Sequence, residues 1–402
     1  MTPPAAVLVT DAPSNANLAV VRSLGRRGIP IGVCGIDGEF NLSFHSRYAS
    51  ECFTVPSPIT DPSGYLSAVT AILRKGRYSV LFPTTERTIK LISARRDVIP
   101  EQVRLPIPDR EALDVALDKE QTVTLAKDLG VPLPATWCPA GSKELATLTR
   151  ELPYPVIVKP RETNFLAPDG RLQKSGYVIA TNPAELGRGY RAIHERVPRP
   201  LIQEVVNGVG MGVFSVWNHG TPLAWFAHRR LREEDPRGSR ASAAVSVPLE
   251  PNLAEWSMRL LKALGWHGVA MVEFKRNAET GQAWLMEING RFWGSLALAL
   301  AAGVDFPYYL YQVATGEPVD APSSYPTGVT ARDAVGELKH LVNVLWRSPR
   351  AGVVTMPGRL RTLLQAPVIL DPRRNSYNWT PDDPAPGRRE WLRFIRHVAR
   401  ES

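Results

Sequence analysis

Apolar residues along the first hundred positions follow the spacings of alternating strands and helices. Short apolar runs at 5–10, 28–34 and 78–82 have the length of buried strands, and 18–24 carries apolar residues at helical spacing. A strand, a helix and a second strand in that order predict a βαβ unit and therefore a parallel sheet. The turn after the first strand reads Asp-Ala-Pro-Ser-Asn and lacks the G-x-G-x-x-G pattern. We therefore do not expect a dinucleotide-binding role.

A hairpin pattern follows much later in the chain. Two strand-like segments, 269–276 and 283–288, flank a polar turn. Side chains alternate across a strand, so Glu273 and Glu287 can approach each other on one side of the sheet, and Asn289 follows on the same side. Two carboxylates and an amide oxygen suit Mg²⁺, which prefers oxygen ligands. The alternative is that all three are ordinary polar residues at strand ends.

Cationic side chains stand at the ends of several predicted elements. Lys159 ends an apolar strand, and its ammonium group must meet an anion or water because burying it unpaired is unfavourable. Arg291 lies two residues beyond Asn289 and adds a planar cation beside the predicted metal ligands. Arg230 belongs to a basic cluster at 229–232, which is either a solvated strand end or a site for a carboxylate or phosphate.

The run Glu287-Ile-Asn-Gly-Arg291 resembles the E-x-N-[PG]-R signature of the ATP-grasp superfamily. The resemblance covers 119–316 well and 1–108 at the level of fold. Three further segments carry it: Asp-Lys at 118–119 with Gly-Val-Pro at 130–132, Pro-Val-Ile-Val-Lys-Pro at 155–160, and Gln-Glu-Val-Val-Asn-Gly at 203–208.

The resemblance implies a role for each matching residue, with ATP and Mg²⁺ as cofactors and Mn²⁺ as an expected substitute. A glycine-bearing loop within 161–177 is expected to close over the phosphates, and only Lys174-Ser175-Gly176 looks loop-like here. Many members of the superfamily have, at the position of Met211, an acidic residue that contacts the ribose of the nucleotide. The implied metal ligands are Glu273, Glu287 and Asn289; the implied nucleotide contacts are Lys119, Lys159, Lys174, Ser175, Gln203, Glu204 and Val206; the implied catalytic cations are Arg291, Lys159 and Arg230.

The expected fold class is α/β, in four parts. By the resemblance, a Rossmann-like pre-ATP-grasp domain at 1–110 precedes a two-lobed α+β ATP-grasp domain. Its first lobe is expected at 111–203 and its second, with the metal site, at 204–319. The resemblance hardly reaches 320–402, which is predicted as a basic, helical C-terminal extension. In the family the N-terminal domain helps to hold the non-nucleotide substrate, so Glu86 is either a substrate contact or a helix cap.

Composition and charge narrow the classes of protein that fit. The 402 residues are 44% apolar, as in an ordinary globular protein, and no apolar run reaches the roughly 18 residues of a membrane span. Three scattered cysteines and the lack of a signal-peptide pattern favour a cytoplasmic location. The net charge of +9 indicates an acidic partner or substrate. Lys and Arg are not interleaved with aromatic residues along one element of the body, so a nucleic-acid partner is not expected.

The last part of the chain carries much of this charge, because 336–402 contains twelve Lys or Arg and six Asp or Glu. Apolar residues at helical spacing predict one amphipathic helix at 336–348, packed on the body, and a second near the C-terminus. The second either covers the core with a solvated arginine face or offers its arginines to an anionic partner, such as a membrane surface, an acidic protein or a charged substrate. The predicted stripes are Leu338, Leu341, Val342, Leu345 and Trp346, and then Trp391, Ile395 and Val398.

The function implied by the resemblance is that of an ADP-forming carboxylate–amine ligase. A substrate carboxylate would attack the γ-phosphate of ATP, and an amine would capture the resulting acyl phosphate. The expected partners are therefore a small-molecule carboxylate and an amine. Two alternatives stay open: an ATP-grasp protein with a non-amine acceptor, and a nucleotide-binding regulatory member without ligase activity. Both metal carboxylates are present, which favours the enzyme.

Overall fold

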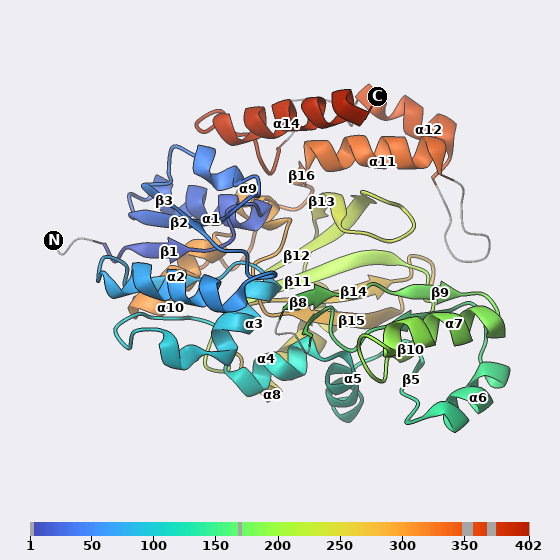
Figure 1. The fold of residues 1–402 in the computed structure, drawn as a ribbon. Helices are drawn as coiled ribbons and strands as arrows, with labels where there is room; N and C mark the ends of the chain where they lie inside the picture. Colours follow the sequence, from blue (N-terminus) through green and yellow to red (C-terminus); the bar gives the residue numbers. More distant parts are fainter. Residues whose placement is uncertain (1–3, 168–170, 348–356, 368–374, 402) are drawn as a thin grey trace.

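The computed structural model describes residues 4–167, 171–347, 357–367 and 375–401 (Figure 1). The chain begins with a four-stranded parallel sheet in the order β3-β2-β1-β4. Helices connect its strands, which confirms the βαβ prediction. Its elements are β1 (Val7–Val9), α1 (Asn15–Arg26), β2 (Ile31–Ile36), η1 (Leu42–His45), β3 (Glu51–Val55), α2 (Pro62–Arg74), β4 (Val80–Phe82), α3 (Glu86–Ala94) and η2 (Arg96–Val98).

The turn after β1 is shaped by a buried aspartate. Asp11 has a left-handed backbone conformation, with φ 69°, which Asp tolerates better than most residues. Its carboxylate accepts hydrogen bonds from the hydroxyls of Thr10, Thr85 and Thr88 at 2.6, 3.0 and 2.7 Å. Ser14 then caps α1. A side chain therefore occupies the turn in which a dinucleotide-binding loop needs glycine.

Helices α4 and α5 lead into a second, antiparallel sheet of order β5-β10-β6-β9. One face of this sheet buries Val156 and Val158 against α6 and α7. Because side chains alternate along β6, Lys159 lies on the opposite face. The elements here are α4 (Arg110–Leu117), α5 (Lys119–Asp128), β5 (Thr136–Trp137), α6 (Ser142–Glu151), β6 (Val156–Lys159), β7 (Asn164–Leu166), β8 (Leu172–Lys174), β9 (Val178–Ala180), α7 (Pro183–His194) and β10 (Leu201–Glu204).

The largest sheet has six antiparallel strands in the order β15-β14-β11-β12-β13-β16. Its β14–β15 hairpin confirms the one predicted from the sequence. One face buries Val272 and Ile288 under α8, so Glu273 and Glu287 lie on the other face. The elements are β11 (Val209–Asn218), β12 (Thr221–Glu233), β13 (Ala241–Ser246), α8 (Pro251–Ala263), β14 (Gly268–Arg276), β15 (Ala283–Asn289), α9 (Leu296–Ala301), α10 (Phe306–Thr315) and β16 (Thr330–Arg332).

The C-terminal extension lies across the edge of the six-stranded sheet and the N-terminal domain (Figure 1). Arg22 of α1 and Asp383 form an ion pair at 2.9 Å, and both side chains are almost fully buried. Ser46 also donates to Asp383, at 2.7 Å. No helix of the described ranges is long and apolar enough to cross a membrane. The helices of the extension are α11 (Ala334–Trp346), α12 (Arg359–Leu364) and α14 (Ala385–Glu401).

Helix α11 confirms the predicted helix but packs through a different face from the one predicted. Glu337 is fully buried and accepts hydrogen bonds from Arg232 at 2.8 Å and from Ser242 at 2.7 Å. Val342 and Trp346 were predicted to face the body, and they are 45% and 73% exposed. The prediction of the buried face was wrong because charged and polar contacts with β12 and β13, not the apolar stripe, fix the helix.

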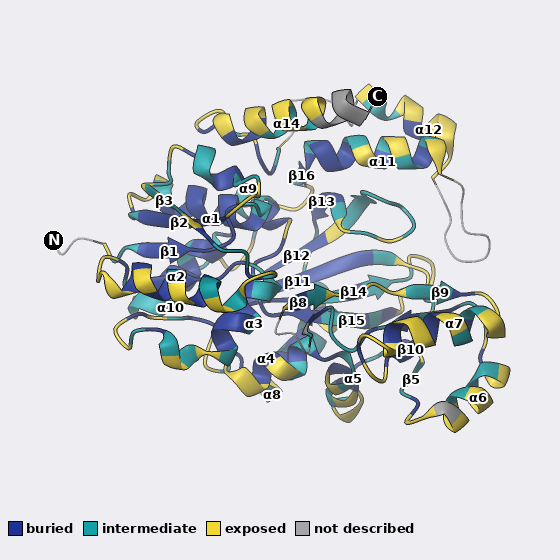
Figure 2. Ribbon diagram, in the orientation of Figure 1, coloured by how far each residue is buried: buried dark blue, intermediate teal, exposed yellow. Residues whose placement is uncertain are grey.

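Helix α14 is also less buried than its stripe predicts (Figure 2). Ile395 is 58% exposed and Trp391 is half-buried. The side chain of Val398 lies outside the described residues. Burial is concentrated at the start of the helix, at Pro386 and Gly387. The helix is therefore attached to the body mainly through its first turn.

Candidate functional site

Two carboxylates meet on the β14–β15 hairpin, on the face turned away from α8. Glu273 lies directly opposite Glu287, and an irregularity in the register follows this pair. The side-chain amide of Asn289 donates to Glu287 Oε1 at 2.9 Å. The structure thus brings the three predicted metal ligands together.

Two arginines flank these carboxylates. Arg291 donates from Nη2 to Asn289 Oδ1 at 3.0 Å. Arg230 of β12 forms ion pairs with Glu273 at 2.6 Å and with Glu233 at 3.2 Å. Arg230 therefore neutralises part of the charge on the hairpin before any ligand arrives, rather than standing free for a substrate.

Burial and neighbouring charges shift the pKa values of the two carboxylates in opposite directions. Burial raises the pKa of Glu273, and the charge of Glu287 adds to the shift. Burial acts in the same direction on Glu287, but Lys119, the hydrogen bond from Asn289 and the charge of Arg291 together lower its pKa. Two half-buried carboxylates on adjacent strands fit a divalent cation that binds through oxygen. The carboxylates are the main candidate ligands for this cation, because Oδ1 of Asn289 already accepts a hydrogen bond from Arg291.

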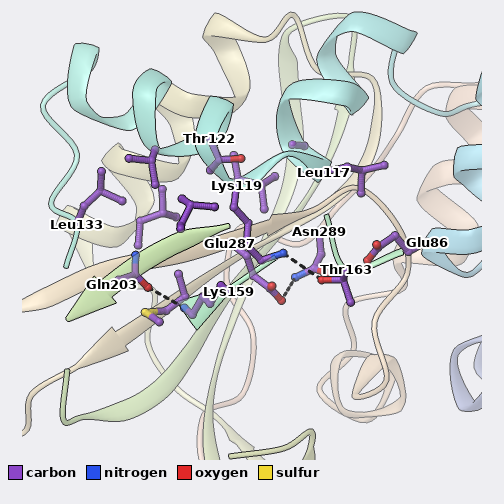
Figure 3. Close-up of a pocket in the computed structure, with 16 residues that line it drawn as sticks. Glu86, Leu117, Lys119, Thr122, Leu133, Lys159, Thr163, Gln203, Glu287 and Asn289 are labelled. Carbon is purple, nitrogen blue, oxygen red and sulfur yellow. Dashed lines mark hydrogen bonds between the residues drawn. The ribbon is translucent and has the colours of Figure 1, made fainter. Parts of the chain in front are cut away.

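Lys159 approaches the hairpin from the second sheet (Figure 3). Its Nζ donates to Gln203 Oε1 at 2.7 Å, and Gln203 Nε2 donates to Thr136 Oγ1 at 2.9 Å. Burial, with the charge of Lys119 nearby, lowers the pKa of Lys159 to about 8. Among the described residues Lys159 forms no ion pair. A half-buried ammonium group held by a neutral amide keeps donors available for an anion.

Lys119 is held at the start of α5. Asp118 caps this helix by accepting from the backbone N–H groups of Glu120 and Gln121 at 2.9 and 3.3 Å. The backbone N–H of Lys119 donates to the carbonyl of Arg161 at 3.0 Å. Its Nζ donates to Thr163 Oγ1, also at 3.0 Å. This network directs the ammonium group toward Glu287, as Figure 3 shows.

Lys119, Lys159, Glu287 and Asn289 line one pocket between α4, α5, the second sheet and β15 (Figure 3). Glu273, Arg230 and Arg291 lie outside its lining. Glu86, at the start of α3, lines it too, and its Oε1 accepts from Asn164 Nδ2 at 2.7 Å. The apolar wall includes Leu117, Leu133 and Leu285. Cations from α5 and the second sheet, a carboxylate from β15 and an acid from α3 therefore share one space. Such a set suits a phosphate-bearing ligand together with a metal cation.

Lys174 and Ser175 do not line this pocket. Lys174 ends β8 and is exposed, whereas Ser175 is buried and donates its backbone N–H to Thr163 O at 3.0 Å. The expected loop is in part the paired hairpin β7–β8, and 168–170 lie outside the described residues. The pocket residue from this stretch is Thr163, which the sequence analysis missed. The only sequence feature that could have indicated Thr163 is its polar side chain shortly after Lys159.

The segment after β10 places Glu204 and Val206 beside the pocket rather than in it. Glu204 is exposed, and its side chain accepts from the backbone N–H just before β5 at 3.3 Å. The carbonyl of Val206 accepts from Lys275 Nζ at 3.2 Å. Lys275 was also missed, although strand alternation places it on the same side of β14 as Glu273. Met211, which stands where a ribose-binding acid was expected, is buried in the core.

The sequence matches one known family and is similar to two known enzymes. The family described as "ATP-grasp in the biosynthetic pathway with Ter operon" matches 198–335, which includes both strands of the β14–β15 hairpin. The carbamoyl phosphate synthase large chain, N-terminal section, of Methanopyrus kandleri is 27% identical over 231 residues, 55% of this chain and 39% of that protein. The D-alanine–D-alanine ligase of Ectopseudomonas mendocina is 26% identical over 204 residues, 48% of this chain and 62% of that protein. The chain thus spans less than two thirds of either relative.

A solved structure shares the fold. The biotin carboxylase of Campylobacter jejuni, in a complex with β,γ-ATP, superposes with a TM-score of 0.65 at 16% identity, over 81% of this chain and 74% of that one. An identity this low speaks for the fold alone. The predicted α/β fold class is confirmed. The family match over 198–335 and the two relatives support the resemblance of this chain to the ATP-grasp superfamily.

Proposed function

We propose that this chain is an ADP-forming ligase that activates a substrate carboxylate as an acyl phosphate and joins it to an amine. The observation that carries the proposal is the pocket in which Lys119 and Lys159 lie with Glu287 and Asn289. A transferring phosphoryl group spreads its charge over several oxygens, so catalysis depends on cations positioned around it. No nucleophile from the protein is needed for this course.

Each residue has a task in this proposal that follows from its surroundings. Lys119 and Lys159 would bind phosphate oxygens, and Gln203 would keep the second ammonium group in place. A magnesium ion held by Glu287 and Glu273 would neutralise charge on the phosphates. Because Lys159 donates to a neutral amide and not to a carboxylate, its positive charge is not neutralised before the ligand binds.

The relatives support the proposal at the level of reaction class. One of them is named a D-alanine–D-alanine ligase, and a second solved structure with the same fold is an L-amino acid ligase from Bacillus licheniformis. Both names describe joining reactions. The carboxylate and the amine used by this chain are to be identified by experiment.

The test is a screen for ADP formation from ATP and Mg²⁺ with amino acids and common metabolic carboxylates, alone and with amines. We expect ADP only when a carboxylate is present and a stable product only when an amine is present. Glu287→Gln should lower turnover by about a hundredfold or more, since a charged ligand is lost where charge develops. Glu279→Gln, in the exposed turn of the same hairpin, is the matched control and should leave turnover unchanged.

Two outcomes would favour the alternatives. Carboxylate-dependent ADP formation with a thiol or hydroxyl as the productive acceptor would replace the amine. ATP binding without ADP formation for any carboxylate would favour the regulatory protein. Wild-type turnover in Glu287→Gln would contradict the assignment of the metal site.

A further inference from the structure

A second cavity lies between the C-terminal extension and the N-terminal domain, outside the pocket described above. It holds about 710 Å³ and opens between α11, α14 and the segment around η1. We call it the α11–α14 groove. Its lining includes Lys339 of α11, Arg389, Arg393 and Arg396 of α14, and the aromatic rings of Phe40 and Phe394.

Positive charge in the α11–α14 groove is poorly compensated. Lys339, Arg389 and Arg396 form no ion pair among the described residues, and Arg393 lies over the ring of Phe40 at 5.0 Å. By contrast, the further lining arginine, Arg240, is paired with acidic side chains. Four exposed cations without a carboxylate partner therefore line one cavity, where a single bound anion could contact several of them.

Acidic groups of the groove do not supply that anion. Its one lining carboxylate is Glu390, which accepts a hydrogen bond from Asn378 at 2.8 Å. Burial raises the pKa of Glu390 to about 7, which weakens its charge near neutral pH. Burial lowers the pKa of His45, and the charge of Arg389 adds to the shift. The His45 shift agrees with positive charge near the cavity, whereas the Glu390 shift comes from burial and from the nearby charge of Asp333.

The groove also offers apolar surface. Val335 is buried at its base, and Leu392 lies in the lining with the rings of Phe40 and Phe394. Rings and aliphatic side chains suit the planar or apolar body of a ligand, and arginines suit phosphate or carboxylate oxygens. The volume is within the usual range of small-molecule sites, about 300 to 1,000 Å³.

We infer that the α11–α14 groove binds a small organic anion, with a phosphate or several carboxylates on a planar or apolar body, at a site separate from the nucleotide pocket. The cations line a concave cavity between two parts of the molecule, which fits a small ligand better than a flat bilayer. The bound anion would join α14 to α11 and to the N-terminal domain. This gives the basic residues of the extension a ligand that the ATP-grasp assignment does not require.

The test is calorimetric binding of phenyl phosphate to the full chain at low salt. We expect Arg389→Gln combined with Arg393→Gln to weaken binding about tenfold or more, since two charge-assisted contacts are lost. Arg388→Gln is the matched control, because Arg388 is exposed on the same helix but does not line the groove. Lys159→Ala should leave the affinity unchanged, which separates the groove from the nucleotide pocket.

A second measurement tests the apolar part of the site. Phenyl phosphate should bind more tightly than inorganic phosphate, and Phe40→Leu should reduce that preference. Equal affinity of the double variant and the wild type would overturn the proposal, as would loss of binding in Lys159→Ala. Vesicles of phosphatidylcholine with phosphatidylserine form the last arm. Vesicle binding that needs Arg389 and Arg393, without phenyl phosphate binding, would show a membrane-docking surface and overturn the small-ligand site.

Discussion

The lowered pKa of Lys159 leads to a prediction about ligand binding in the pocket that this residue lines. Its burial lowers its pKa to about 8, so the ammonium group is charged below that pH and becomes neutral above it. A neutral lysine loses its attraction for phosphate. We therefore expect the affinity for a non-hydrolysable ATP analogue to fall as the pH rises through about 8.

The measurement is calorimetry with wild type and Lys159→Arg on both sides of that pH. Arginine stays charged throughout, so its affinity should change less with pH. The same decline in both proteins would show that another group controls binding.

Removal of the same ammonium group gives a second prediction. Lys159→Ala should weaken binding of the ATP analogue about tenfold or more, because a charge-assisted hydrogen bond to phosphate is lost. Lys127→Ala is the control, since Lys127 is exposed on α5. An unchanged dissociation constant in Lys159→Ala would mean that this lysine does not contact the nucleotide.

Residues of the site were predictable where the signal was local. The spacing of Glu287, Asn289 and Arg291 lies within one strand and its end, so alternation alone places them together. Thr163 enters the pocket because Lys119, 44 positions earlier, donates to it. The sequence pattern around Thr163 does not reveal this long-range contact. The burial of Ser175 could not be predicted for the same reason.

At the level of elements, a buried ion pair between Arg22 and Asp383 attaches the segment before α14 to α1. Asp383→Ala would leave Arg22 buried without its charge partner, and we expect a loss of about 3 kcal/mol in the free energy of unfolding. Asp382→Ala is the control, because Asp382 and its partner Arg26 are 40% and 39% exposed. It should cost less than about 1 kcal/mol.

Urea unfolding of both variants measures the difference. Equal losses for the two aspartates would show that burial does not decide the strength of this attachment. A loss confined to Asp383→Ala would identify the ion pair with Arg22 as the main contact between α1 and the extension.

Elements were predicted better than their packing. The β14–β15 hairpin has its turn and both strands within about twenty positions, so its pairing follows from the local pattern. The face through which α11 packs follows instead from Glu337, whose partners Arg232 and Ser242 lie 105 and 95 positions earlier. An apolar stripe predicts burial only when no stronger polar contact competes for the helix.

For the whole molecule, the structure separates the pocket lined by Lys119 and Lys159 from the last helix. Deletion of 387–402 keeps Asp383 and every residue that lines the pocket. We expect the affinity for the ATP analogue to stay within about twofold of wild type, because distant sites contribute independently. The melting temperature should fall by a few degrees, and phenyl phosphate binding should disappear. A large loss of ATP-analogue affinity in the folded, truncated protein would contradict this separation.

The ion pair between Arg22 and Asp383 also has a consequence for synthesis of the chain. Its partners are 361 positions apart, and at about 5 to 20 residues per second the ribosome needs roughly 20 to 70 seconds to make the intervening chain. Throughout that interval the emerging parallel sheet carries a guanidinium group whose counter-charge does not yet exist. The first domain to leave the ribosome therefore gains this contact only after the last part of the chain has been made.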